Sequence, residues 1–316
     1  PPVEDCGGEL RRVPMPEELW REVESWVVKD ANDSRLSEPR RCRGFEMGIA
    51  WEAVARLMQY RAARDARAAG QVLVYVQAID SHKGLRLPDA DYRRALQVVS
   101  LTKTGNRLGM CPLFIGMRVR LLAKLSAKDQ LVQDAVGVVE GREFDEREFQ
   151  GDAEDWRDDS GYRAHRVRNA GYVRLRFMPR CVYVRFDKYE KDVGHGPGVV
   201  LVRPSPSSWQ YLGHTGVGLD RRPLKVNMSR VQIPLAPESV RTVQTAQGMS
   251  MDAAHMFLAK AGSMSEDDWW LHVYVMISRV CTARQILAFG LPPRWLFERG
   301  PPRYVQQGLR WLQDVS

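Results

Sequence analysis

The order of segment types along the chain restricts its possible folds more than any other feature. Helix- and strand-forming segments alternate up to residue 111, short β-rich runs occupy residues 112–230, and the alternation returns from residue 231. Each middle run is apolar and bounded by Gly, Pro or charged residues, which is typical of a small β-barrel. An α/β unit that carries an inserted barrel would produce this order. We therefore expect a mixed α/β fold with one β-rich insertion.

The sequence predicts four sections. Residues 1–44 form a polar leader with one amphipathic helix, residues 45–111 and 231–316 form the α/β unit, and residues 112–230 form the barrel with a charged loop. Apolar spacing predicts the local structure of the α/β sections. The expected elements are a helix over 49–69, a strand over 71–80, a strand over 231–236, a turn and helix over 244–262, a buried strand over 271–278 and a C-terminal helix over 304–312.

Composition narrows the functional classes. Among the 316 residues, 47 are basic and 39 acidic, which favours an anionic partner such as nucleic acid. The 5 cysteines include no CxxC pair and the 6 histidines never pair at metal-ligand spacing, so we expect no metal site and no disulfide framework. No apolar run approaches the roughly 20 residues of a membrane span, so we expect no membrane partner. Since the first residue is proline and not methionine, we expect a fragment or a processed product.

Two polar segments near the C-terminus are candidates for chemistry. Gln247 and Gly248 precede an expected helix, where glycine permits a tight turn and backbone amides can hold a phosphate. Ser250 or Asp252 could instead cap that helix without any ligand. Arg279 follows the expected buried strand at its carboxyl end, where open α/β sheets bind ligands, so it can stabilise charge on a transferring phosphoryl group. An ion pair with a neighbouring carboxylate is the alternative for this arginine.

The two segments resemble the fifth and sixth conserved motifs of superfamily-one helicases of the Pif/RecD type, which run approximately T-I-H-K-S-Q-G-x-T and Y-V-A-x-S-R. Residues 242–250 read TVQTAQGMS and residues 274–279 read YVMISR. Upstream, residues 112–125 and 133–141 are similar to the family's G-x-R-V-M-L and N-G-x-x-G-x-V signature. The resemblance covers about residues 110–290 in the family's own order.

The resemblance implies an α/β fold of the P-loop NTPase type, namely a second RecA-like lobe interrupted by a small Src-homology-3-like β-barrel, with the first RecA-like lobe absent. It implies the C-terminal fragment of an ATP-dependent 5'-3' DNA helicase that acts on single-stranded DNA or duplex junctions. It also implies a nuclear location, with mitochondrion and cytoplasm as alternatives. By the same resemblance Arg279 is the catalytic residue that reaches the γ-phosphate. Gln247 and Gly248 join it in binding nucleotide, and the DNA contacts are Thr242, Gln244 and Ser250.

The chain also departs from the family pattern. Gln244 and Thr245 replace the His-Lys of the fifth motif, which removes a cation, and Gln133-Asp134 replaces an Asn-Gly turn. The sequence contains no G-x-x-x-x-G-K-[ST] loop and no Walker-B acidic pair, both of which ATP hydrolysis needs. We therefore expect this chain alone not to be an ATPase. ATP and Mg²⁺ would bind only together with a missing first lobe, supplied in cis or in trans.

Other interpretations stay open at this stage. A non-catalytic nucleic-acid-binding or scaffold protein derived from a helicase would have the same fold. A hydrolase that uses Ser278 is a third interpretation, although no GxSxG elbow surrounds this serine. Trp269 and Trp270 could stack on bases or belong to a core. A set of arginines could follow a phosphate backbone or neutralise the acidic residues 140–159, and these are Arg163, Arg166, Arg168, Arg174 and Arg176.

Overall fold

The computed structural model describes residues 4–6, 9–11, 14–30, 33–38, 44–86, 95–98, 100–149, 172–215 and 222–315. The chain forms two compact units. The first unit combines Pro1–Val54 with Ser239–Ser316, and the second unit is Ala55–Glu238. The segment between the two parts of the first unit is thus longer than the predicted 112–230, because strand β4 (Leu73–Gln77) pairs with strands β7 and β10 of the second unit.

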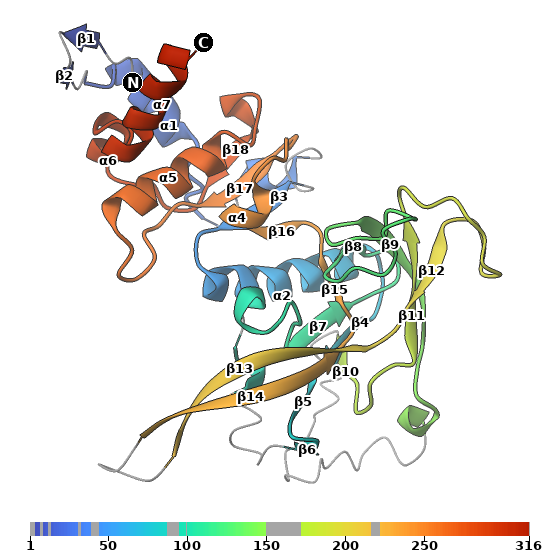
Figure 1. The fold of residues 1–316 in the computed structure, drawn as a ribbon. Helices are drawn as coiled ribbons and strands as arrows, with labels where there is room; N and C mark the ends of the chain where they lie inside the picture. Colours follow the sequence, from blue (N-terminus) through green and yellow to red (C-terminus); the bar gives the residue numbers. More distant parts are fainter. Residues whose placement is uncertain are drawn as a thin grey trace. The chain divides into compact units, whose positions relative to one another are not determined.

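A four-stranded parallel sheet forms the centre of the first unit (Figure 1). Its order is β16 (Val240–Thr242), β3 (Phe45–Gly48), β17 (Ala254–Phe257) and β18 (Ile286–Ala288). Strand β3 therefore lies between two strands that come from the far end of the chain. Because parallel neighbours cannot be joined by a tight turn, helices and loops connect these strands.

One face of this sheet packs against helices and forms the main core of the first unit. Met47 and Met256 from the sheet are fully buried beside Val273 and Met276 of helix α5 (Glu266–Ile277). The same core includes residues of the helices that flank it, which are α1 (Glu17–Ser25), α4 (Val243–Ala246) and α6 (Arg294–Glu298). The last helix, α7, runs over Arg303–Val315.

Two predictions for local structure in the first unit are wrong. The expected strand 271–278 lies in helix α5, and the expected helix 244–262 is the short α4 followed by a turn and strand β17. Helix α5 begins where Ser265 accepts a hydrogen bond from the Asp268 amide, and its first turn carries three acidic residues. Both features stabilise a helix start. They outweigh the strand preference of a run rich in β-branched residues, and tertiary packing of one helix face completes the choice.

The second unit contains a five-stranded antiparallel sheet in the order β12 (Val199–Val202), β11 (Cys181–Phe186), β9 (Val136–Glu143), β8 (Arg118–Leu121) and β15 (Leu235–Pro237). The sequence predicted the first four of these as short strands, and the structure confirms them. Strands β12 and β15 lie at the two ends of this order. Among the strands that the structure describes, no pairing joins these two ends into a closed ring.

Two further sheets complete the second unit. One has the order β10 (Tyr172–Arg174), β4 and β7 (Met110–Leu113), and the other has the order β13 (Ser205–Thr215), β14 (Arg222–Gln232), β5 (Ile79–His82) and β6 (Leu85–Arg86). Strands β13 and β14 make a long two-stranded ribbon, drawn in yellow and gold in Figure 1. The sequence did not predict this ribbon. Helix α2 (Trp51–Ala68) confirms the helix expected over 49–69.

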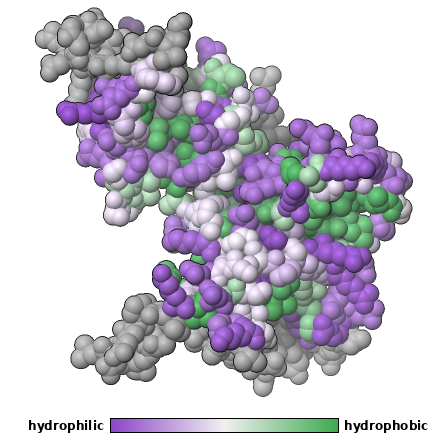
Figure 2. Space-filling model, in the orientation of Figure 1, coloured by the Kyte–Doolittle hydropathy of each residue, from purple (hydrophilic) through white to green (hydrophobic). Residues whose placement is uncertain are grey.

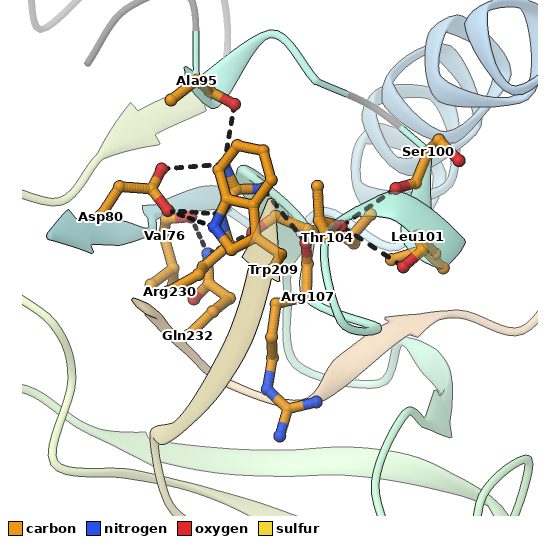
Figure 3. Close-up of polar contacts among 11 residues, drawn as sticks. Val76, Asp80, Ala95, Ser100, Leu101, Thr104, Arg107, Trp209, Arg230 and Gln232 are labelled. Carbon is orange, nitrogen blue, oxygen red and sulfur yellow. Dashed lines mark hydrogen bonds and ion pairs between the residues drawn. The ribbon is translucent and has the colours of Figure 1, made fainter. Parts of the chain in front are cut away.

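A buried ion pair fixes the base of the ribbon to strand β5 (Figure 3). Arg230 and Asp80 are both 0% exposed, and the guanidinium binds the carboxylate through two hydrogen bonds of 2.8 Å. Arg230 also donates to the carbonyls of Ala95 at 2.7 Å and Arg107 at 3.2 Å. The indole of Trp209 donates to Asp80 at 3.2 Å and lies 4.7 Å below the guanidinium. Every strong polar group of this pair is therefore satisfied, as burial of charge requires.

The surface drawn in Figure 2 is largely hydrophilic, with smaller apolar areas between the polar ones. Exposed large apolar side chains in the first unit include Tyr274, Tyr304 and Trp311. Within the described residues, every helix is too short or too polar to serve as a membrane span.

Candidate functional site

Thr242 lies at the end of strand β16 and begins helix α4. Its side chain is buried, its amide donates to Thr245 Oγ1 at 3.0 Å, and its own hydroxyl accepts from the Thr245 amide at 3.4 Å. This reciprocal pair is a capping box, which satisfies amide groups that a helix start leaves free. Thr242, expected as a DNA contact, thus has its hydroxyl occupied inside the fold.

Gln244 is exposed on the first turn of α4 and contacts helix α5. Its Nε2 lies 3.0 Å from His272 Nε2, and His272 Nδ1 lies 2.5 Å from the carbonyl oxygen of Asp268. A carbonyl only accepts, so Nδ1 carries the imidazole proton and Nε2 accepts from the Gln244 amide. Sequence reasoning did not single out His272, because it is distant from Gln244 along the chain and no local pattern pairs them.

Gln247 and Gly248 form a turn that ends helix α4. Gly248 has φ of 80°, a left-handed conformation that favours glycine, and it is exposed, so that a methyl group added at its Cα would have no atom within 4 Å. The expected arrangement, in which this turn starts a helix and Ser250 or Asp252 caps it, is wrong, because strand β17 follows. A phosphate site at a helix start after Gly248 is therefore not formed. Ser250 lies exposed in the loop before β17.

Arg279 follows the end of helix α5, where Ser278 is the last capping residue. Its guanidinium donates to the carbonyl of Val275 at 2.9 Å, to the carbonyl of Met249 at 3.3 Å and to Ser278 Oγ at 2.8 Å. No carboxylate forms an ion pair with Arg279 within the part of the chain that the structure describes. The alternative in which this arginine neutralises a nearby acid thus finds no support there.

The two motif segments lie side by side although they are distant in sequence. The Met251 amide donates to the Arg279 carbonyl at 2.8 Å, and Met251 and Val280 form a parallel bridge. The Arg279 side chain reaches the carbonyl of Met249, which directly follows Gly248. The structure therefore places the Arg279 guanidinium beside the residue that follows the Gln247-Gly248 turn.

The remaining candidate residues divide between core and surface. Trp269 is buried and donates to the Leu258 carbonyl at 2.9 Å, whereas Trp270 is half-buried and stacks on Tyr274 at a centroid distance of 5.3 Å. Ser278 Oγ donates to the Val275 carbonyl at 2.9 Å, an arrangement that does not activate a nucleophile.

The charged loop is partly self-neutralising. Arg180 pairs with Glu143 at 3.3 Å and with Glu146 at 2.8 Å, and the amide of Arg176 donates to the Glu148 carboxylate. Of the other arginines that could follow a phosphate backbone, Arg174 lies on strand β10. Arg163, Arg166 and Arg168 lie outside the described residues.

Comparison with known proteins identifies the fold. No family model matches the chain, and no curated protein sequence matches it. Among solved structures, the Pif1 helicase from Candida albicans has a TM-score of 0.51 and 16% identity, over 98% of this chain and 60% of that chain. The Bacteroides Pif1 helicase in complex with ADP-AlF3 and ssDNA has a TM-score of 0.50 and 11% identity, over 96% of this chain and 51% of that chain.

This chain thus spans about half to three-fifths of the length of the structures it matches. The α/β fold class and the likeness to Pif/RecD-type helicases, both inferred from the ordered motifs, are confirmed at the level of fold. The chain has a mixed α/β fold with a parallel sheet, and this fold is similar to that of Pif1 helicases.

Proposed function

We propose that this chain is the C-terminal part of an ATP-dependent DNA helicase of the Pif/RecD type, in which Arg279 acts as the arginine finger. The observation that carries the proposal is the placement of Arg279 beside the Gln247-Gly248 turn, with backbone carbonyls and a serine as its described partners. A similar fold occurs in the Bacteroides Pif1 helicase, whose structure holds ADP-AlF3 and ssDNA.

The electrostatics of Arg279 suit an anionic ligand. Three hydrogen bonds fix the orientation of the guanidinium, and its remaining N–H donors are available for a phosphate oxygen. A preorganised cation of this kind stabilises charge that develops on a transferring phosphoryl group. The sequence lacks the loop that would cradle the phosphates, so Arg279 would meet ATP and Mg²⁺ held by a first lobe.

Single-stranded DNA is the proposed nucleic-acid partner. The exposed polar side chains of Gln244 and Ser250 lie on the same short segment as the nucleotide-facing turn, so one segment can contact both ligands. The net charge of +8 favours a polyanion. Thr242 contributes by fixing the start of helix α4.

The test uses the chain together with a first RecA-like lobe that carries the phosphate loop, supplied in cis or in trans. Replacing Arg279 by alanine is expected to lower DNA-stimulated ATP turnover by a factor of about 10³ or more, because arginine fingers contribute on this scale. Affinity for single-stranded DNA should stay within about twofold, since Arg279 does not contact the strand in this proposal. The matched control is Arg303→Ala, which removes an exposed arginine of helix α7.

Unchanged turnover in Arg279→Ala would refute the finger. No turnover in the unmodified protein, together with tight binding of single-stranded DNA, would instead favour a non-catalytic nucleic-acid-binding protein.

A further inference from the structure

The contact between Gln244 and His272 connects the exposed side of helix α4 to helix α5. Val243 and Ala246 of α4 are buried in the core, so Gln244 points outward from the same turn. His272 is held in turn by the Asp268 carbonyl, at 2.5 Å from Nδ1. This second bond fixes the orientation of the ring and places its N–H at Nδ1, so that Nε2 is an acceptor aimed at Gln244.

The Gln244 side chain has more hydrogen-bonding groups than its contact with His272 uses. Among the described residues, the Gln244 side chain makes one hydrogen bond, from its amide to His272 Nε2, which leaves its second N–H and its carbonyl oxygen for a ligand. An amide with one donor and one acceptor matches a phosphate oxygen on one side and a sugar oxygen on the other. Thr245 stands where the family motif has a lysine, and its hydroxyl is used in the capping box. Gln244 therefore has no neighbouring lysine in this motif to share the contact with a ligand.

The contact with His272 is expected to raise ligand affinity by reducing the conformational entropy that Gln244 loses on binding. A free glutamine side chain on the surface has several rotamers, and binding must select one of them. His272 selects one conformation before the ligand arrives, which removes part of that cost.

From these observations we infer that His272 is a positioning residue, which holds Gln244 in place to bind the sugar–phosphate backbone of single-stranded DNA. This inference rests on the proposed function, since it assumes that α4 faces the DNA strand. It adds a residue from a different helix to the DNA site.

The experiment is a double-mutant cycle on the complete chain, read by fluorescence anisotropy of a labelled oligodeoxythymidine at low salt. His272→Ala is expected to weaken binding by about 2- to 10-fold, the range for one immobilised side chain. Gln244→Ala should weaken binding at least as much, and adding His272→Ala to it should have no further effect. His272→Gln, which again offers an acceptor, should restore most of the affinity.

Controls and alternative outcomes separate this inference from the proposed function. Gln307→Ala on helix α7 and His195→Ala in the second unit remove the same residue types elsewhere, and both should leave binding unchanged. Thermal unfolding of each variant checks that the fold is kept. If His272→Ala weakens binding equally with and without Gln244, or if Gln244→Ala has no effect, the inference fails while DNA binding stands. If the unmodified chain does not bind the oligonucleotide, its proposed DNA contacts fail and the inference fails with them.

Discussion

Replacing Arg230 by methionine is expected to destabilise the second unit by about 3–5 kcal/mol, the usual cost of removing one partner from a buried ion pair. Asp80 is 0% exposed and accepts two hydrogen bonds from Arg230. Without that guanidinium, the carboxylate would keep the Trp209 indole at 3.2 Å as its described partner. A single neutral donor does not offset the removal of a carboxylate from water. The ribbon β13–β14 would lose its anchor to β5 at the same time.

Removing both Asp80 and Arg230 should destabilise the second unit less than removing either one alone. Asp80→Leu combined with Arg230→Met takes away the desolvated charges together, so the penalty of an uncompensated charge disappears. The carbonyls of Ala95 and Arg107 lose their donor in Arg230→Met and in the double variant alike, so this loss does not distinguish the two variants. We therefore expect the double variant to be more stable than Asp80→Leu or Arg230→Met, although less stable than the unmodified protein.

Urea unfolding followed by circular dichroism measures these changes, and thermal unfolding gives an independent value. For a domain of this size, each kcal/mol lowers the melting temperature by about 2–4 °C, so Arg230→Met should lower it by about 6–20 °C. The matched control is Arg118→Met. The Arg118 side chain is 46% exposed, and its replacement breaks ion pairs with Asp187 and Glu238. Exposed pairs contribute about 0–1 kcal/mol. The reasoning is refuted if Arg230→Met and Arg118→Met destabilise equally, or if the double variant costs the sum of the two single changes.

Two further predictions concern titration and glycine. Burial raises the pKa of the Cys111 thiol from 9.0 to about 12 and the pKa of Tyr75 from 10.0 to about 12, so both groups favour folding below pH 9 and lose that contribution as the pH rises toward 12. The urea midpoint of the second unit should therefore fall between pH 9 and pH 12, and a constant midpoint would contradict this. Gly105 has φ of 58°, and a methyl group there would lie 2.2 Å from Ser207 Oγ and 2.8 Å from the Ser208 carbonyl, so Gly105→Ala should cost more than about 2 kcal/mol. Gly248→Ala should cost only about 1 kcal/mol, from backbone conformation alone, and equal costs in urea unfolding would show that the close contacts at Gly105 relax freely.

Strands whose pattern is local were predictable from the sequence. In β11, buried Val182, Val184 and Phe186 alternate with more exposed residues, and this period of two is visible in the sequence itself. Strand β3 was missed because it has four residues, includes the buried polar residue Glu46, and is defined by partners from the other end of the chain. The ribbon β13–β14 was missed for a related reason, since its polar residues suggest a loop until pairing with its neighbour strand is known.

In the candidate site, too, some features could be predicted from local sequence and others depend on distant parts of the chain. The order of motifs along the chain indicated that Arg279 and the Gln247-Gly248 turn belong to one site, which stays a prediction; the structure places Arg279 in contact with Met249, the next residue after that turn. The predicted element was wrong on each side of that site. The Ser265 cap and the acidic first turn are local signals of a helix start that could have been recognised in the sequence. The packing of Met256 and Met276 is decided by tertiary structure and could not. His272 could not be found from the sequence, since only the fold places its ring beside Gln244.

The helix that replaced the expected strand also changes how the site works mechanically. Helix α5 and the residue after its cap contact the segment 242–251 at two places, through His272 at Gln244 and through Arg279 at the Met249 carbonyl and the Met251 amide. His272 lies within α5, and Arg279 directly follows the Ser278 cap at the end of that helix, seven residues further along the chain. The Arg279 amide donates to the Met276 carbonyl at 3.1 Å and its guanidinium donates to the Val275 carbonyl at 2.9 Å, so a displacement of α5 moves the imidazole and the guanidinium together. In the proposed helicase, the group that faces the phosphate and the group that orients the DNA contact would thus be carried by one rigid element, which a strand at this position would not provide because its side chains alternate between two faces.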